Sequence, residues 1–197
     1  MKYNIYDTEE YDISDDLYFL RFFSEYNNWK TDKCNILYEN KNTVGLNSIR
    51  SFFKLDPLII KNNQLKTILN IKKYASDILH FAGEKIFDRK YDNLNCFDLL
   101  NLAKKEGKSL NCRYITSVFT QMLLSIGYKA RWVSCHSMDI RDKECHCVCE
   151  VYIDSLKKWI VCDPSFNCLY FNKKGNILNL YEMRKLIIKG ERLIIAG

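Results

Sequence analysis

The fold of this chain is decided by residues 111–127, which read NCRYITSVFTQMLLSIG. Within them, apolar side chains recur at intervals of three and four residues, as on one buried helix face. This apolar stripe consists of Ile115, Val118, Phe119, Met122, Leu123 and Ile126. Asn111 is a favourable N-cap and Gly127 a favourable C-terminal stop. The stretch therefore predicts a central, buried helix whose first residue is Cys112.

After this helix the hydrophobic pattern changes to alternation, which predicts strands. The strand candidates are residues 129–135, 144–154 and 158–163. The loop of residues 155–157 is short enough for a hairpin. Asp163-Pro164 ends the last of these strands, because proline has no N–H to donate to a ladder. We therefore expect adjacent antiparallel strands and an α+β fold.

The chain before the central helix reads as mainly helical. Amphipathic patterns predict helices over residues 12–29, 46–55, 62–81 and 96–107. We expect residues 1–93 to form an N-terminal helical region that packs on a core of residues 94–197, in one compact unit. A short helix over residues 181–189 and a strand over 192–196 complete the predicted core.

The composition is that of a folded globular protein without a nucleic-acid partner. Of the 197 residues 47% are hydrophobic, and the chain has only seven glycines and two prolines, so disorder is not expected. The net charge is +6, but the basic residues are scattered in pairs. A nucleic-acid-binding protein concentrates them in one stripe.

The start of the chain and its cysteines bear on location. The first residues are acidic and lack the apolar segment of a secretory signal, and no run reaches the ~20 apolar residues of a membrane helix. We therefore expect a cytoplasmic protein without a membrane partner. Nine cysteines would suit a disulfide scaffold, but the count is odd and no export signal is visible, so we expect free thiols.

Cys112 occupies the position in which a thiol is most easily activated. At a helix N-terminus, unpaired N–H groups and the helix dipole favour the thiolate, which is the nucleophilic form. The N–H of Cys112 could also donate to an oxyanion formed by attack on a carbonyl. The alternative is an inert cysteine packed in the core, which is common.

His146 and Asp163 are the candidates for the base and for the group that orients it. Alternation places His146 on one face of its predicted strand, with Cys145 and Cys147 on the other. Hairpin pairing can bring Asp163, at the end of the next strand, beside the imidazole. Taken singly, His146 reads as a satisfied core histidine and Asp163 as a turn residue before proline. A nucleophile at a helix start followed by a base and an orienting acid on successive strands is a more specific arrangement.

These residues stand in motifs that resemble a known family. Residues 111–112 leading into 123–131 resemble the nucleophile helix and the following GxPAR-type turn of the transglutaminase-like superfamily. Residues 146–152 and 159–164 are similar to its HxWxEVY and WxxxDP elements. The resemblance covers roughly residues 98–167. Arg113 and Val148 stand where many relatives have tryptophan.

The resemblance implies a papain-like core in which Cys112 is the nucleophile, His146 the general base and then acid, and Asp163 the group that orients the imidazole. It implies cysteine-dependent acyl transfer on a peptide or amide bond of a peptide or protein substrate, without a cofactor or metal. Hydrolysis is favoured, since nothing in the sequence resembles the calcium-binding loops or extra domains of the large crosslinking transglutaminases. Transamidation or deamidation of protein glutamine and a non-catalytic, peptide-binding scaffold remain as alternatives.

The same region of the sequence allows other interpretations. A zinc site would draw on Cys135, His136, Cys145, Cys147, Cys149, Cys162 and Cys168. Strand residues two apart are separated by about 6.5 Å, whereas the sulfurs around one zinc lie roughly 3.8 Å apart, and no CxxC pair occurs. His136 competes with His146 as the base, and His146 is preferred for its position on the strand. Arg131 and Glu150 are expected to form an internal ion pair rather than to contact substrate.

Overall fold

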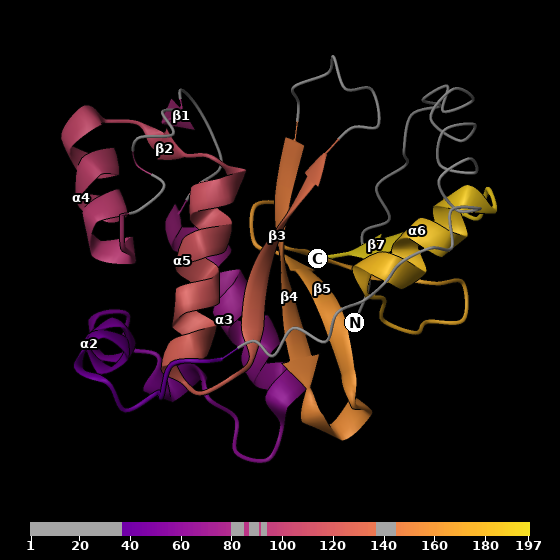
Figure 1. Cartoon of the computed structure of the whole chain (residues 1–197), viewed down its shortest axis with the longest axis horizontal. Helices are drawn as coiled ribbons and strands as arrows, with labels where there is room; N and C mark the ends of the chain where they lie inside the picture. Colours follow the sequence, from indigo (N-terminus) through magenta and orange to yellow (C-terminus); the bar gives the residue numbers. More distant parts are fainter. Residues whose placement is uncertain (1–36, 80–84, 87–90, 92–93, 137–144) are drawn as a thin grey trace.

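The computed structural model of the chain describes residues 37–79, 85–86, 91, 94–136 and 145–197. Its described part is an α+β fold in which helices pack against one antiparallel sheet (Figure 1). The helices before the sheet are α2 (Val44–Phe52), α3 (Gln64–Leu79), α4 (Cys96–Glu106) and α5 (Cys112–Ser125). This agrees with the predicted fold class. The helix predicted over residues 12–29 lies outside the described residues.

Helix α5 is the central element, as its sequence predicts. It begins at Cys112, and the side chain of its N-cap Asn111 accepts a hydrogen bond from the Tyr114 N–H at 3.0 Å. All six residues of the apolar stripe are buried. Gly127 follows the helix with a φ of +87°, a left-handed conformation that glycine adopts without strain. α5 is thereby buried between the other helices and the sheet (Figure 1).

The sheet has the strand order β3-β4-β5-β6-β7. Its strands are β3 (Ala130–His136), β4 (Cys145–Ile153), β5 (Lys158–Asp163), β6 (Cys168–Phe171) and β7 (Ile194–Ala196), and α6 (Leu180–Ile188) lies between β6 and β7 in the sequence. All four pairings are antiparallel. The predicted hairpin between β4 and β5 is confirmed, and its connection is a 3-10 turn at Asp154–Leu156 followed by Lys157 with a φ of +48°.

Two features of the sheet structure were not predicted. The first is β6, a four-residue strand that lies between β5 and β7. Its residues are all apolar and show no alternation, so the sequence pattern around it does not distinguish a strand from a buried turn. The second is a short parallel pair formed by β1 (Lys85–Ile86) and β2 (Ser109–Leu110). Both depend on partners that are remote in sequence.

One hydrophobic core joins the helices to the sheet. It includes Ile68 and Ile71 of α3, Phe119 and Met122 of α5, and Val151 of β4, all essentially without exposed surface. α2 and α3 both pack on α5. The described helices upstream of residue 93 therefore share a core with the sheet. The division of the chain at residue 93 stays a prediction.

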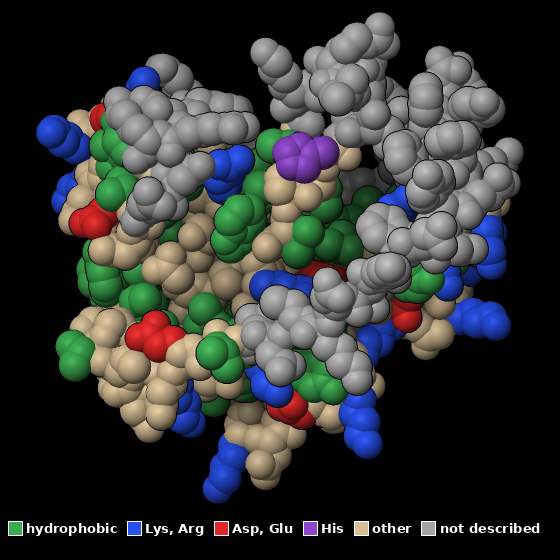
Figure 2. Space-filling model, in the orientation of Figure 1, with side chains coloured by type: hydrophobic (Ala, Val, Ile, Leu, Met, Phe, Trp, Pro, Cys, Tyr) green, Lys and Arg blue, Asp and Glu red, His purple; other side chains and the backbone are tan. Residues whose placement is uncertain are grey.

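The described surface carries charges of both signs. On the face drawn in Figure 2, Lys and Arg side chains are scattered, most of them near the margin and some toward the middle, and do not gather in one stripe. Within the described ranges, no helix is both long enough and apolar enough to cross a membrane.

Candidate active site

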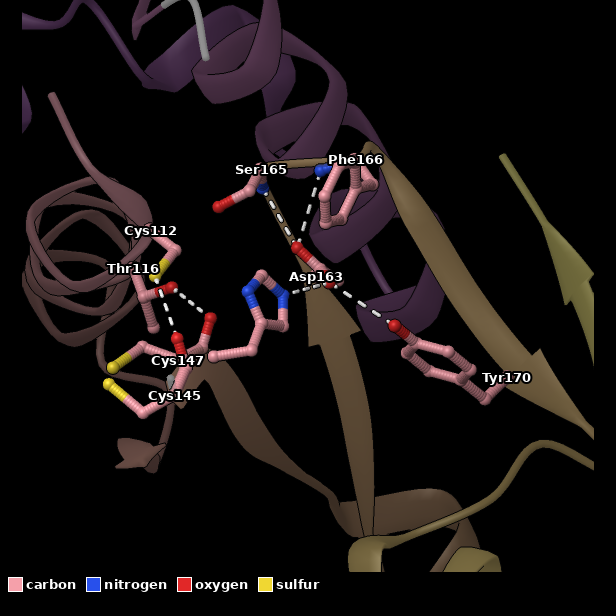
Figure 3. A network of polar contacts seen from close by, with 9 residues as sticks. Cys112, Thr116, Cys145, Cys147, Asp163, Ser165, Phe166 and Tyr170 are labelled. Atoms are coloured by element: carbon pink, nitrogen blue, oxygen red, sulfur yellow. Dashed lines mark hydrogen bonds and ion pairs between the residues drawn. The ribbon is translucent and has the colours of Figure 1, made fainter. Parts of the chain in front are cut away.

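The first turn of α5 places the Cys112 thiol over the start of β4. The Cys112 Sγ lies 3.9 Å from the main-chain oxygen of Cys145. One turn further along α5, the Thr116 hydroxyl donates a hydrogen bond of 2.9 Å to the main-chain oxygen of Cys147. The two contacts fix the start of α5 on β4, as Figure 3 shows. Cys112 therefore lies beside the segment that carries His146.

His146 and Asp163 meet across the β4–β5 pair. The His146 Nε2 lies 2.6 Å from the Asp163 Oδ2. The Asp163 side chain has no exposed surface, whereas the His146 side chain remains 32% exposed. Since Nε2 is engaged by the carboxylate, Nδ1 is the ring nitrogen left for the thiol. The structure thus brings together the three residues selected from the sequence.

The Asp163 carboxylate is held by further donors (Figure 3). Its Oδ1 accepts hydrogen bonds from the Ser165 N–H at 2.9 Å and the Phe166 N–H at 3.3 Å, and its Oδ2 accepts one from the Tyr170 hydroxyl at 3.2 Å. Because every one of these groups donates, the ionised carboxylate is the form that satisfies them. The carboxylate is therefore fixed in position before any substrate arrives.

The surroundings of His146 favour the imidazolium ion. The hydrogen bond that the imidazole donates to Asp163 is the largest cause, and the Cys112 sulfur adds to it, while burial acts in the opposite direction. Together they raise the pKa of His146 to about 10. A charged imidazole at neutral pH is the partner that a thiolate needs.

The surroundings of Cys112 favour the thiolate. Hydrogen bonding by the Cys147 thiol is the largest cause that lowers the pKa of Cys112, and His146 lowers it further, against the effect of burial. The same interaction, together with burial, raises the pKa of Cys147. Cys112 is thus the anionic member of this pair of thiols.

In other described cysteines the pKa of the thiol is raised, not lowered. Burial raises the pKa of Cys96 and Cys168 to about 11 and that of Cys149 to about 12. Eight cysteines are described, and all are free. A reagent specific for thiolates should therefore discriminate strongly between Cys112 and these buried thiols.

The structure also locates the other residues that were singled out from the sequence. His136 is exposed at the end of β3, opposite Cys145, and the imidazole bound to Asp163 is that of His146. The predicted ion pair is present, with the Arg131 Nη2 at 2.7 Å from the Glu150 Oε2. No group of three His, Cys, Asp or Glu side chains in the described part of the chain could hold a metal ion.

Three residues lie next to the site without having been predicted there from the sequence. Cys147 belongs to the strand face opposite His146, and alternation alone did not show that the start of α5 would lie against it. Tyr170 lies on the unpredicted strand β6. The ring of Phe166 lies 5.3 Å from that of His146 and is 60% exposed. It follows Asp163-Pro164-Ser165 directly, which is the one signal that could have placed it at the site.

A helix-borne thiol beside a histidine on an antiparallel strand, with a buried acid on the next strand, is a cysteine-based catalytic fold. The family model of the transglutaminase-like superfamily matches residues 61–164, which is more than half of the chain. This chain therefore belongs to the transglutaminase-like superfamily. No curated protein matches it.

Solved structures show a more distant likeness. A candidate cysteine protease from Cytophaga hutchinsonii matches with a TM-score of 0.45 and 14% identity over 77% of this chain. Red sea bream transglutaminase matches with a TM-score of 0.35 and 15% identity over 62% of this chain and 26% of its own length. The chain covers 49% of the length of the first of these two proteins.

Proposed function

We propose that this protein is a cysteine-dependent acyl-transfer enzyme that cleaves a peptide or amide bond, with Cys112, His146 and Asp163 as its catalytic triad. The observation that carries the proposal is the 2.6 Å contact of His146 Nε2 with the fully buried Asp163. It holds the imidazole beside Cys112, which among the cysteines that the structure describes is the one whose surroundings favour the thiolate. The separate features each have a structural explanation, and their convergence is what supports catalysis.

In the first half of the reaction, the Cys112 thiolate attacks the substrate carbonyl and forms a tetrahedral intermediate. The N–H of Cys112 lies in the first turn of α5, where amides have no intrahelical acceptor. It serves as one donor to the oxyanion. His146 then transfers its proton to the leaving amine, and the acyl group remains on Cys112 as a thioester.

In the second half, neutral His146 removes a proton from water as the water attacks the thioester carbonyl. The carboxylic acid product leaves, and the thiolate and imidazolium of the resting state are restored. Asp163 keeps the imidazole in orientation throughout and stabilises its charged form. The proton balance closes over one turnover, since the proton given to the leaving amine is replaced by one from water.

Hydrolysis is the favoured outcome because the site is open to water. Transamidation requires an amine to reach the thioester before water does, which enzymes achieve by excluding water. With the His146 side chain 32% exposed, water has access to the reacting atoms. The exposed Phe166 ring beside His146 offers an apolar surface to a side chain of a peptide substrate.

Incubation with reduced, carboxymethylated casein and dansylcadaverine tests the proposed reaction class. We expect new peptide amino termini or released ammonia to exceed dansylcadaverine incorporation, and both to vanish in Cys112→Ala. Incorporation of the amine as the dominant product would reassign the enzyme to transamidation. No product of any kind, across a set of unrelated unfolded proteins, would favour a binding scaffold.

A further inference from the structure

Helix α3 contains a buried lysine that the catalytic proposal does not use. Lys72 is only 3% exposed. The next residue, Lys73, shows the ordinary behaviour of a lysine on a helix, since it is exposed and forms an ion pair of 2.9 Å with Asp77. Lysine is almost never fully buried, because removing its ammonium group from water is costly unless a partner compensates. The partner of Lys72 therefore indicates why it is there.

That partner belongs to the turn that follows Asp163. The Lys72 Nζ donates a hydrogen bond to the main-chain oxygen of Asn167. Asn167 has a φ of +53°, a left-handed conformation that asparagine adopts more readily than most residues other than glycine. α3 passes behind this turn in Figure 3. A residue of α3 thus anchors this turn.

The anchored turn is the one that holds the catalytic carboxylate. The N–H groups of Ser165 and Phe166, two residues and one residue before Asn167, donate to the Asp163 Oδ1. The other oxygen of Asp163 contacts His146. A displacement at Asn167 would therefore move the donors at 165 and 166, then the carboxylate, and finally the imidazole.

We infer that Lys72 is a positioning residue, which holds the 163–168 turn so that Asp163 keeps His146 oriented toward Cys112. Its consequence for catalysis rests on the proposed function, whereas its effect on the turn does not. The titratable groups that act electrostatically on Lys72 are Cys162 and Asp163 of β5, Cys168 of β6 and Lys73 of its own helix. Burial lowers the pKa of Lys72. The inferred role needs only a donor on Nζ, which both protonation states provide.

The experiment compares Lys72→Met with Lys73→Met, a matched change of the neighbouring, exposed lysine. Two readings are taken on each protein and on the parent. One is the pH dependence of iodoacetamide alkylation at Cys112, followed in the tryptic peptide of residues 109–113. The other is hydrogen exchange, by NMR, at the amides of Ser165 and Phe166 relative to the amides of α5.

In Lys72→Met we expect the midpoint of the Cys112 alkylation profile, which lies at about pH 4 in the parent, to rise by about one pH unit, as for a thiol whose pKa rises by about one. We also expect exchange at Ser165 and Phe166 to accelerate more than in α5. Lys73→Met should match the parent in both readings. If Lys72→Met does not fold, Lys72→Gln receives the same two measurements with the same expected directions, because its shorter amide cannot reach Asn167.

Two results would overturn the inference. One is a variant at Lys72 with the parent's alkylation profile and the parent's exchange at 165 and 166. The other is exchange that rises equally in the turn and in α5 while the alkylation profile stays unchanged, which marks a merely structural role. If the parent itself shows no activated Cys112, the proposed function fails, while the exchange reading still decides the role of Lys72 in the turn.

Discussion

The charge of Asp163 is the feature of the site whose removal has the clearest expected effect. Asp163→Asn keeps the shape of the side chain, and its amide oxygen can still accept the N–H groups of Ser165 and Phe166. What is lost is the negative charge 2.6 Å from the His146 Nε2. Since that contact is the largest cause of the raised pKa of His146, the imidazolium ion should be destabilised.

The magnitude follows from the geometry. An opposite charge within a few ångströms changes a pKa by about 1 to 3. The His146 side chain is 32% exposed, so water screens part of this interaction, and we expect a fall toward the lower end, about 1 to 2. The imidazolium ion of the variant should then be lost between about pH 8 and 9 instead of near pH 10. The change in the alkylation rate of Cys112 that accompanies loss of the imidazolium ion should therefore move to lower pH by about 1 to 2.

The assay is the rate of iodoacetamide alkylation of Cys112 between pH 4 and 10, in the parent, in Asp163→Asn and in Asp154→Asn. Asp154 is an exposed aspartate in the β4–β5 connection and serves as the matched control. We expect its profile to coincide with that of the parent. A folded Asp163→Asn protein with the parent's profile would refute the reasoning, because the carboxylate would then have no influence on the thiol.

Three further predictions concern the surroundings of the site and the stability of the fold. Cys147→Ala should raise the pKa of Cys112 and shift its alkylation profile to higher pH, whereas Cys147→Ser, which keeps a donor, should shift it less; equal profiles would exclude Cys147 as the donor. Arg131→Ala should lower the free energy of unfolding by about 2 to 4 kcal/mol in urea titrations, because it leaves the Glu150 side chain, 6% exposed, without its cation. Glu150→Ala should cost less, since Arg131 is 42% exposed and can be solvated; the opposite order would contradict this. Folding raises the pKa of His146 from 6.5 to about 10 and lowers that of Cys112 from 9.0 to about 4. Between pH 6.5 and 9.0 the His146–Cys112 pair therefore binds the same number of protons in the native and unfolded states, so its contribution to the free energy of unfolding should not change with pH. That contribution should decline as pH falls from 6.5 toward about 4, and again as pH rises from 9.0 toward about 10. A parent whose stability, relative to the double variant Cys112→Ala with His146→Ala, changes steadily across the flat range would contradict that assignment.

Much of the fold was predictable because its central elements carry strong local signals. The stripe from Ile115 to Ile126 and the N-cap Asn111 predict α5 and its first residue, since amphipathic period and capping act within one element. The alternating runs that became β4 and β5 predicted a hairpin because only a short turn separates them. β6 could not be predicted in the same way, because its short apolar run can be recognised as a strand only from its pairing with β5 and β7 in the folded sheet.

The same distinction applies to the candidate site. Cys112, His146 and Asp163 could be selected from the sequence because each stands at a position that secondary structure alone defines: a helix start, a strand face and a strand end. Tyr170 and Lys72 could not be selected from the sequence, because each reaches the site from an element whose packing on the 163–168 turn is a tertiary feature. A lysine in an amphipathic helix reads as a surface residue from sequence, and only the structure shows that Lys72 is buried.

Transfer of an acyl group to Cys112 is the event that tests the central claim most directly. The protein is mixed briefly with p-nitrophenyl acetate, quenched in acid and mapped by mass spectrometry. The account predicts one acetyl group on the tryptic peptide of residues 109–113, formed together with a burst of p-nitrophenol, absent in Cys112→Ala and much slower in His146→Ala. Acetylation of other cysteines while Cys112 remains unmodified would contradict it.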